Sequence, residues 1–212
     1  MKSRFIRRVP RRSPIAIFTV IVVGFLIGAL TGVMMLFLSQ PQGPARVQTS
    51  GKALVGGPFK LVDQSGKDVT NRDFRGRHML VFFGFTHCPD ICPAELQVMS
   101  SALDQLGDKA NKVVPIFITL DPERDTQAAI ADYVKHFGSN FVGLTGSPEA
   151  VAAAAKAYRV AYAKVEEQGA ADGYTVDHSA LVYLMGTDGE YVTHFAYGTS
   201  ANKMAEGLAR YL

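Results

Sequence analysis

The residues from Ile15 to Leu38 form an uncharged apolar run of 24 residues that divides the chain into two unequal parts. As a helix rising 1.5 Å per residue, the run would be about 36 Å long and could cross a bilayer core of about 30 Å with modest tilt. A cleaved secretory signal has a shorter apolar region, of about 7–15 residues, and ends at a small-residue cleavage motif. Because the run is longer and the following SQPQGPARV lacks that motif, we predict an uncleaved transmembrane anchor over residues 15–38.

Positive charge is concentrated before this run. Six of the 22 Lys and Arg residues lie in the first twelve positions, with no acidic residue among them. Because cytoplasmic flanks of membrane helices are enriched in Lys and Arg, we predict that residues 1–14 are cytoplasmic and that the domain lies on the other side. This describes a single-pass protein of the bacterial plasma membrane with a periplasmic domain. The Arg-rich start also resembles a mitochondrial presequence, so the alternative is the mitochondrial inner membrane, with the domain facing the intermembrane space.

The composition of the rest of the chain excludes several classes of protein. Beyond the first twelve residues there are 16 basic and 19 acidic side chains, so the domain is slightly acidic and we expect no nucleic-acid partner. A hydrophobic content of 48% excludes a disordered chain. Two cysteines are too few for a disulfide-dense mini-domain or a four-thiolate zinc site.

Residues 58–212 form the predicted domain, because residues 39–57 are rich in Pro and Gly and indicate a linker. Two continuous apolar runs, 79–85 and 113–120, are typical of strands buried on both faces. The helical patterns begin at Pro93, after Asp125–Thr126 (ending at Phe137), at Pro148 and at Ala201. Strand pairs are expected within 58–70 and 180–195. This alternation predicts an α/β thioredoxin-like sandwich with an N-terminal β-hairpin extension.

Both cysteines lie in the segment CPDIC, Cys88–Cys92, directly after the strand predicted at 79–85. A structural disulfide closing so short a loop would contribute only about 2 kcal/mol, against about 4.7 kcal/mol for a 100-residue loop. The carboxyl end of a buried strand is also where open α/β sheets place ligand sites. Pro93 suits a first helical turn, so we predict a helix beginning there with Cys92 as its cap, which favours thiolates. The pair could therefore act as a dithiol, a disulfide or part of a metal site.

A soft metal would need a further ligand, which one of the five histidines could supply. His178 lies in the segment 173–179, a predicted loop before the strand from Ala180, and in a thioredoxin-like fold this loop approaches the cysteine turn. A solvated loop residue is the alternative interpretation of His178. The other four have simpler interpretations. His78 lies at a strand start, and His87 is a neighbour of Cys88 turned away from it. His136 lies at a helix end, and His194 lies within a strand.

From Gly56 onward the chain resembles the Sco family in five segments that occur in order: FFGFTHCPDICP, TLDPERDT, FVGLTGS, YRVAYAKV and YTVDHSALVYLM. Members of that family are membrane-anchored, thioredoxin-like copper proteins of cytochrome c oxidase assembly. The resemblance implies that Cys88, Cys92 and His178 bind copper. It also implies the copper-site subunit of the oxidase as acceptor and another copper chaperone as a possible donor. Asp121 matches an acidic residue that the family implicates in function, without a definite role.

Two thiolates and one imidazole suit Cu(I), and with a further donor also Cu(II), although zinc accepts the same ligands. The leading hypothesis is a copper metallochaperone that serves the binuclear copper site of cytochrome c oxidase. The alternative is a thiol–disulfide reductase, which would use Cys88 and Cys92 as redox-active thiols and would need no histidine. Asp90, inside the cysteine segment, could add negative charge near the metal or simply be solvated.

Overall fold

The folded part of this computed structural model comprises residues 54–169 and 171–212, and residues 23–25, 27–31 and 34 are also described. The chain divides into two units, 1–51 and 52–212. The described residues of the first unit are helical. Within the described ranges, no helix combines the length and the apolarity that a bilayer crossing requires. The predicted 1–14 segment, most of the 15–38 anchor and residues 39–53 of the predicted linker lie outside the described residues.

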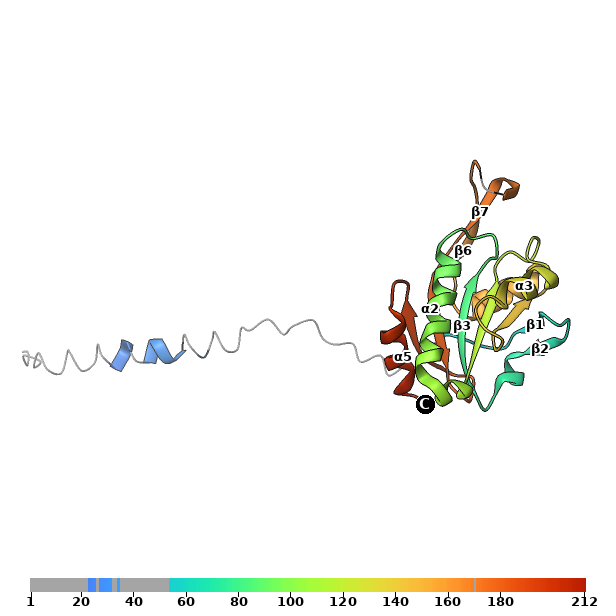
Figure 1. Ribbon diagram of the computed structural model, residues 1–212. Coiled ribbons are helices and arrows are strands. Elements are labelled where there is room, and N and C mark those ends of the chain that lie inside the picture. The colour runs from blue at the N-terminus through green and yellow to red at the C-terminus, as the bar shows by residue number, and fades with distance from the viewer. Residues whose placement is uncertain (1–22, 26, 32–33, 35–53, 170) are drawn as a thin grey trace, which may run out of the picture. The chain divides into compact units, whose positions relative to one another are not determined.

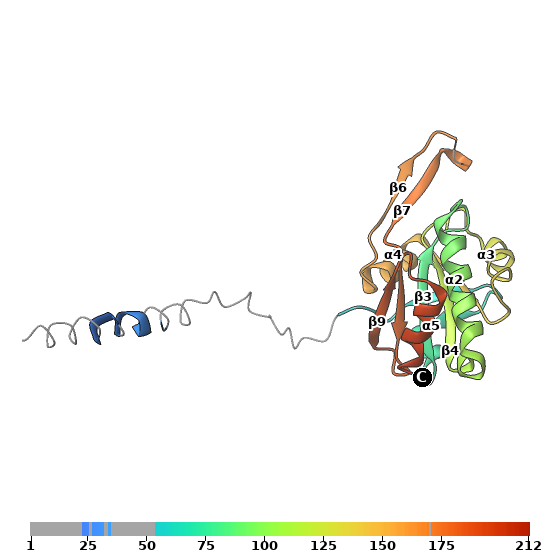
Figure 2. The same cartoon turned by 60° about the vertical axis from the view of Figure 1, so that its left-hand side comes forward.

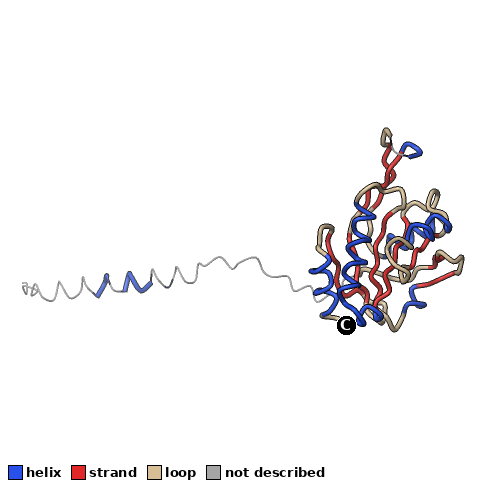
Figure 3. The backbone as a smooth tube through the Cα atoms, in the orientation of Figure 1, coloured by secondary structure: helices blue, strands red, loops and turns tan. Residues whose placement is uncertain are grey.

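A seven-stranded mixed sheet forms the centre of the domain, in the order β2-β1-β5-β4-β3-β8-β9. Its strands, drawn in red in Figure 3, are β1 Lys60–Asp63, β2 Asp68–Thr70, β3 His78–Gly84, β4 Val113–Thr119, β5 Val142–Thr145, β8 Leu181–Met185 and β9 Tyr191–Ala196. The three central strands β3, β4 and β5 are parallel, and the β1–β2 and β8–β9 hairpins extend the sheet on either side with antiparallel pairing. Strands β3 and β4 are almost completely buried, as their apolar sequences predict.

Helices cover both faces of the sheet. They are α2 Ile91–Leu106, α3 Gln127–Val134, α4 Pro148–Ala157 and α5 Ala201–Ala209, with short 3-10 turns at Asn71–Phe74, Gly107–Lys112 and Ala171–Gly173. On one face α2 and α5 lie side by side (Figure 1), and α3 packs there too, since Phe117 of β4 contacts the ring of Tyr133. On the other face, Phe83 of β3 contacts Tyr158 at the end of α4. The predicted thioredoxin-like sandwich with an N-terminal hairpin is confirmed.

Three local predictions were wrong in detail. Helix α2 begins at Ile91 with Asp90 at the cap position, so Cys92 lies inside the first turn. Pro93 is compatible with this start, because the first backbone N–H groups of a helix need no partner within it. Helix α3 ends at Val134 and not at Phe137, and the capping side chain is Thr126 alone, whose hydroxyl accepts from the N–H of Ala129.

A second, two-stranded sheet projects from the sandwich. Strands β6 Tyr162–Glu166 and β7 Tyr174–His178 pair antiparallel, with Tyr162 opposite His178 at the base. Figure 2 shows this hairpin extending away from the main sheet on the side where β3 ends. The predicted loop before β8 is therefore largely a strand, and His178 is its last residue.

Candidate metal centre

Cys92 is fixed in the core where strand β3 meets helix α2. Its side chain has no exposed surface, and a methyl group on Gly84 would lie 2.7 Å from the Cys92 Sγ. Because this distance is shorter than any ordinary contact, only glycine at the end of β3 lets the sulfur sit against the strand. Cys88, in the connecting turn, is half-buried and packs on the edge of the same core.

The two thiols are free, and their environments differ. The Cys92 backbone N–H donates to the Cys88 Sγ at 3.3 Å. A hydrogen bond from the Cys92 thiol, helped by backbone N–H groups of Cys92 and Asp90 and by the nearby His178, lowers the pKa of Cys88 to about 5. The same thiol–thiol bond together with burial raises the pKa of Cys92 far above its ordinary value. At neutral pH the site therefore holds a thiolate at Cys88 and a thiol at Cys92.

His178 faces the buried thiol. Its Nε2 lies 3.5 Å from the Cys92 Sγ, and its Nδ1 lies 3.3 Å from the carbonyl oxygen of Ser179. Since a carbonyl oxygen only accepts, Nδ1 donates in this contact, and Nε2 faces the Cys92 sulfur. The rings of Phe82 and Phe85 meet the imidazole edge-on, at centroid distances of 6.0 and 6.2 Å. This packing fixes the ring plane and keeps water from one side of it.

The other histidines make contacts of different kinds. His87 turns away from Cys88, its Nδ1 lying 3.1 Å from the Thr86 hydroxyl. His194 contacts the hydroxyl of Tyr191 on the exposed side of β9. The Nδ1 of His136 lies 3.2 Å from the carbonyl oxygen of Tyr133, just after α3. Of the five, the structure brings only His178, among the described residues, within hydrogen-bond distance of a cysteine sulfur.

A cleft of about 360 Å³ opens beside the thiols, between the cysteine turn and the β6–β7 hairpin. Its lining includes Phe85, Cys88, Asp90, Ile91 and His178. Within the described residues, no three His, Cys, Asp or Glu side chains already surround a single point as a metal would require. Cys92 and His178 face each other, whereas the Cys88 sulfur accepts the Cys92 N–H.

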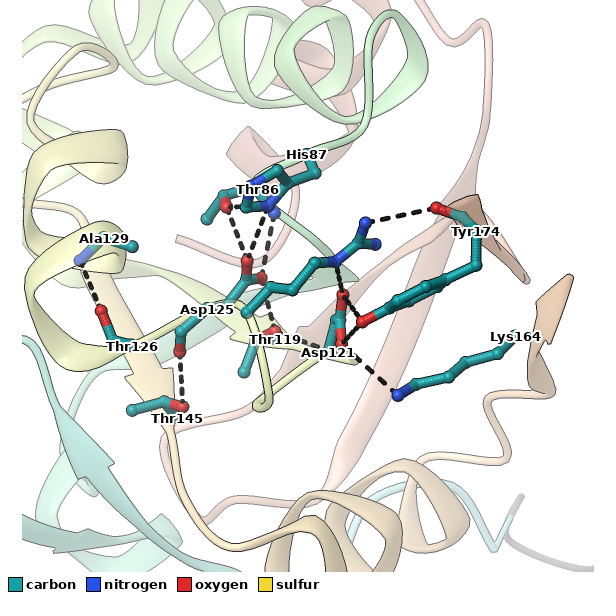
Figure 4. Close-up of polar contacts among 11 residues, drawn as sticks. Thr86, His87, Thr119, Asp121, Asp125, Thr126, Ala129, Thr145, Lys164 and Tyr174 are labelled. Atoms are coloured by element: carbon teal, nitrogen blue, oxygen red, sulfur yellow. Dashed lines mark hydrogen bonds and ion pairs between the residues drawn. The ribbon is translucent and has the colours of Figure 1, made fainter. Parts of the chain in front are cut away.

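A polar cluster behind this centre was not found from the sequence. It is built on the turn after β4, where Asp121 and Asp125 have no exposed surface, and Figure 4 shows their side chains directed at Tyr174 and Thr86 respectively. Arg124 joins the cluster with its Nε 2.5 Å from Asp121 Oδ2. The signal was the segment DPERDT, which places five charged or hydroxyl side chains directly after a buried strand. From the sequence, the resemblance implicates Asp121 without a definite role, and Asp125–Thr126 are expected only to start a helix.

These features define a class of protein: a thioredoxin-like domain with two free thiols and an imidazole beyond the carboxyl end of a central parallel strand. The family model described as SCO1/SenC matches residues 47–212, more than three quarters of the chain. The chain belongs to the SCO1/SenC family.

Individual relatives agree with this assignment. The human protein named "Protein SCO1 homolog, mitochondrial" is 43% identical over 164 residues, covering 76% of this chain and 54% of its own length. The copper-bound crystal structure of Arabidopsis thaliana ScoI has a TM-score of 0.71 at 41% identity, and the copper-bound structure of Bradyrhizobium japonicum ScoI has a TM-score of 0.68 at 44% identity. Each match covers 74% of this chain, with 97% and 99% of the respective structures. The chain spans about half the length of the human relative and of a mitochondrial SCO1 homolog from Arabidopsis thaliana.

Proposed function

We propose that this protein is a copper metallochaperone that binds one copper ion through Cys88, Cys92 and His178. The observation that carries the proposal is the 3.5 Å approach of the His178 Nε2 to the Cys92 Sγ, with Cys88 in the turn four residues before Cys92. Soft thiolates with an imidazole form a donor set suited to Cu(I), and to Cu(II) when a further donor joins. Copper-bound structures of relatives at 41% and 44% identity support the same metal.

Copper is the cargo in this proposal, and the difference in burial between the thiols suits transfer. Cys92 is fully buried and acts as the fixed donor, whereas Cys88 and His178 line the open cleft. An incoming acceptor thiolate can reach the metal from the side of Cys88 and replace the donors one at a time. Copper then passes between proteins without release into solution. The proposed acceptor is the binuclear copper site of cytochrome c oxidase during its assembly, and another copper chaperone would be the donor.

The proposal includes a place in the cell. Residues 15–38 would anchor the protein with residues 1–14 in the cytoplasm, residues 39–57 as linker and the domain, 58–212, in the periplasm. The equivalent arrangement in mitochondria is the inner membrane, with the domain facing the intermembrane space.

Anaerobic titration with Cu(I) against a chromophoric chelator tests the copper site in the full chain. We expect one tightly bound Cu(I), and a loss of affinity of more than about tenfold in Cys88→Ser, Cys92→Ser and His178→Ala, since even residues behind the ligands typically contribute 10–100-fold. His194→Ala is the matched control, because His194 is exposed on β9 and contacts Tyr191 instead. Equal affinities of His178→Ala and His194→Ala would remove His178 from the site.

The unequal thiols favour a second candidate, a thiol–disulfide reductase. The Cys88 thiolate would attack an acceptor disulfide and release one acceptor thiolate. The Cys92 thiol, losing its proton, would then displace the second and leave a Cys88–Cys92 disulfide, so two electrons pass to the acceptor. This role needs no imidazole. If His178→Ala retains full oxidase assembly in cells while either Cys→Ser substitution abolishes it, the reductase is the correct function.

A further inference from the structure

One turn of the chain contacts the two segments that carry the candidate copper ligands, the segment before the cysteines and the hairpin that ends at His178. It consists of residues 121–126, DPERDT, between β4 and α3. Figure 4 shows it between the segment that leads to the cysteines, marked by Thr86, and the hairpin that ends in the histidine, marked by Tyr174 and Lys164. These two segments are separated by about ninety residues of sequence. The turn therefore joins, by side-chain contacts, the cysteine segment and the β6–β7 hairpin, which are not neighbours in the sequence.

The carboxylate of Asp125 holds the cysteine side. It accepts the Thr86 backbone N–H at 2.9 Å and the Thr86 hydroxyl at 2.5 Å. The Thr119 hydroxyl donates to the same carboxylate at 2.6 Å. Asp125 has no exposed surface, so water does not compete for these bonds. Since Thr86 lies two residues before Cys88, this carboxylate fixes where the cysteine turn leaves β3.

The carboxylate of Asp121 holds the histidine side. The Tyr174 hydroxyl lies 3.0 and 3.1 Å from its two oxygens. Arg124 binds the same carboxylate, donates from its guanidinium to the Tyr174 carbonyl oxygen at 3.2 Å, and stacks 3.7 Å from the centroid of the Tyr174 ring. Tyr174 is the first residue of β7 and His178 is the last. Both the side chain and the backbone at the start of that strand are therefore attached to the turn.

The neighbouring strand is attached as well. Lys164 of β6 lies 2.6 Å from Glu123 Oε2 and 4.0 Å from Asp121 Oδ1. Its ammonium also lies 4.7 Å from the centroid of the Tyr174 ring. Strand β6 is largely exposed, whereas β7 is mostly part-buried and its Val176 belongs to the core. These polar contacts, together with the packing of Val176, hold the direction of the hairpin relative to the sandwich.

From this arrangement we infer that Asp121 and Asp125 are positioning residues that set the separation between the two thiols and the imidazole. Asp125 acts through Thr86 on the cysteines, and Asp121 acts through Arg124 and Tyr174 on His178. The inference rests on the proposed copper-binding function. The turn keeps the His178 Nε2 beside the Cys92 Sγ before the metal binds. Binding therefore requires little further ordering of the hairpin.

The test uses Tyr174→Phe in the full chain, a substitution that removes only the hydroxyl bound to Asp121. We expect Cu(I) affinity to fall by about 10- to 100-fold, as is typical when a residue that orients a ligand is lost. In the metal-free protein, the amides of residues 174–178 should exchange with deuterium faster than in the parent. The matched control is Tyr197→Phe, which removes the same atom from an exposed tyrosine between β9 and α5.

A double-mutant cycle separates positioning from general destabilisation. If Tyr174 acts through His178, adding Tyr174→Phe to His178→Ala should not lower the Cu(I) affinity further. Thr86→Val, which acts on the cysteine side, should retain its full effect in that background. In the Cu(II)-loaded chain, the imidazole nitrogen coupling seen by electron paramagnetic resonance should weaken in Tyr174→Phe and persist in Thr86→Val.

Two outcomes would overturn the inference while leaving the copper site intact: Tyr174→Phe binding Cu(I) as tightly as Tyr197→Phe, or its loss persisting undiminished in His178→Ala. If the parent chain binds Cu(I) no more tightly than His178→Ala, the proposed function fails instead. Should circular dichroism show that Tyr174→Phe is unfolded, Arg124→Lys replaces it with the same expectations. That variant keeps the charge beside Asp121 and loses the stacking and the forked donors.

Discussion

Cys88 and Cys92 are four residues apart, but their pKa values differ because the Cys88 sulfur receives hydrogen bonds and Cys92 donates them. We expect the alkylation rate of Cys88 by iodoacetamide, in the reduced and metal-free chain, to rise with pH around a midpoint near 5 and to be constant above about pH 6. The thiolate is the nucleophile, so the rate follows its population. The measurement is the alkylation rate by mass spectrometry between pH 4 and 9.

Cys92→Ala provides the control for this profile. It removes the hydrogen bond that contributes most to the low pKa of Cys88, so the midpoint should move upward, toward the ordinary thiol value of 9.0. Cys92 itself, buried and protonated, should react only when the protein unfolds. A midpoint already near 9 in the unsubstituted chain would show that the thiols do not interact as described.

Glu95 is a buried acid one turn beyond Cys92 on the same helix. It is 2% exposed, its Oε1 has no hydrogen-bond partner within the described part of the chain, and burial raises its pKa to about 7. The folded state thus keeps a proton that the unfolded state releases near pH 4.5, so the contribution of Glu95 to stability falls as pH rises from 4.5 to 7. We expect Glu95→Gln to remove this loss and to raise the free energy of unfolding at pH 8 by up to about 3 kcal/mol.

Thermal unfolding of the metal-free full chain at pH 5 and pH 8 measures this effect. Compared with the unsubstituted chain, Glu95→Gln should raise the unfolding midpoint at pH 8 more than the midpoint at pH 5, whereas Glu206→Gln, which alters an exposed acid on α5, should change neither. An equal pH dependence in Glu95→Gln and the unsubstituted chain would mean that Glu95 ionises normally in the folded state.

At the scale of the elements, the sequence predicts correctly those strands and helix ends that depend on nearby residues. The apolar runs of β3 and β4, and the Ser147–Pro148 start of α4, appear where their sequences place them. The predicted start of α2 was wrong by two residues. Pro is acceptable at several positions of a first helical turn, so Pro93 does not identify the first residue of the helix. Residues 174–178 were expected to be a loop, since they form a strand only by pairing with β6 across a turn without a strong sequence signal.

The candidate site likewise has a part that the sequence predicts and a part that depends on tertiary packing. The spacing of Cys88 and Cys92 and their position after a buried strand are visible in the sequence, whereas the approach of His178 depends on how the β6–β7 hairpin docks. The place of His178 before the strand from Ala180 makes it a candidate, and the resemblance to a known family implies it as the third ligand. Tyr174 and Thr86 gave no signal, because each matters through a contact between segments that are distant in sequence.

At the scale of the whole molecule, the remaining prediction concerns attachment to the membrane. Burying 24 uncharged residues in a bilayer is strongly favourable, so the full chain should sediment with membranes and resist extraction at alkaline pH. A variant lacking residues 1–53 should be found in the soluble fraction, because the described domain from residue 54 onward has its own core. Fractionation of expressing cells followed by immunoblotting measures both.

The shortened variant also separates anchoring from copper chemistry. Since Cys88, Cys92 and His178 all lie in the second unit, we expect it to bind one Cu(I) with the affinity of the full chain. It should nevertheless support oxidase assembly poorly, because an anchored donor meets a membrane-bound acceptor at a much higher effective concentration than a freely diffusing one. Release of the full chain by alkaline extraction would contradict the anchor. Normal assembly by the soluble variant would show that delivery does not depend on holding donor and acceptor in the same membrane.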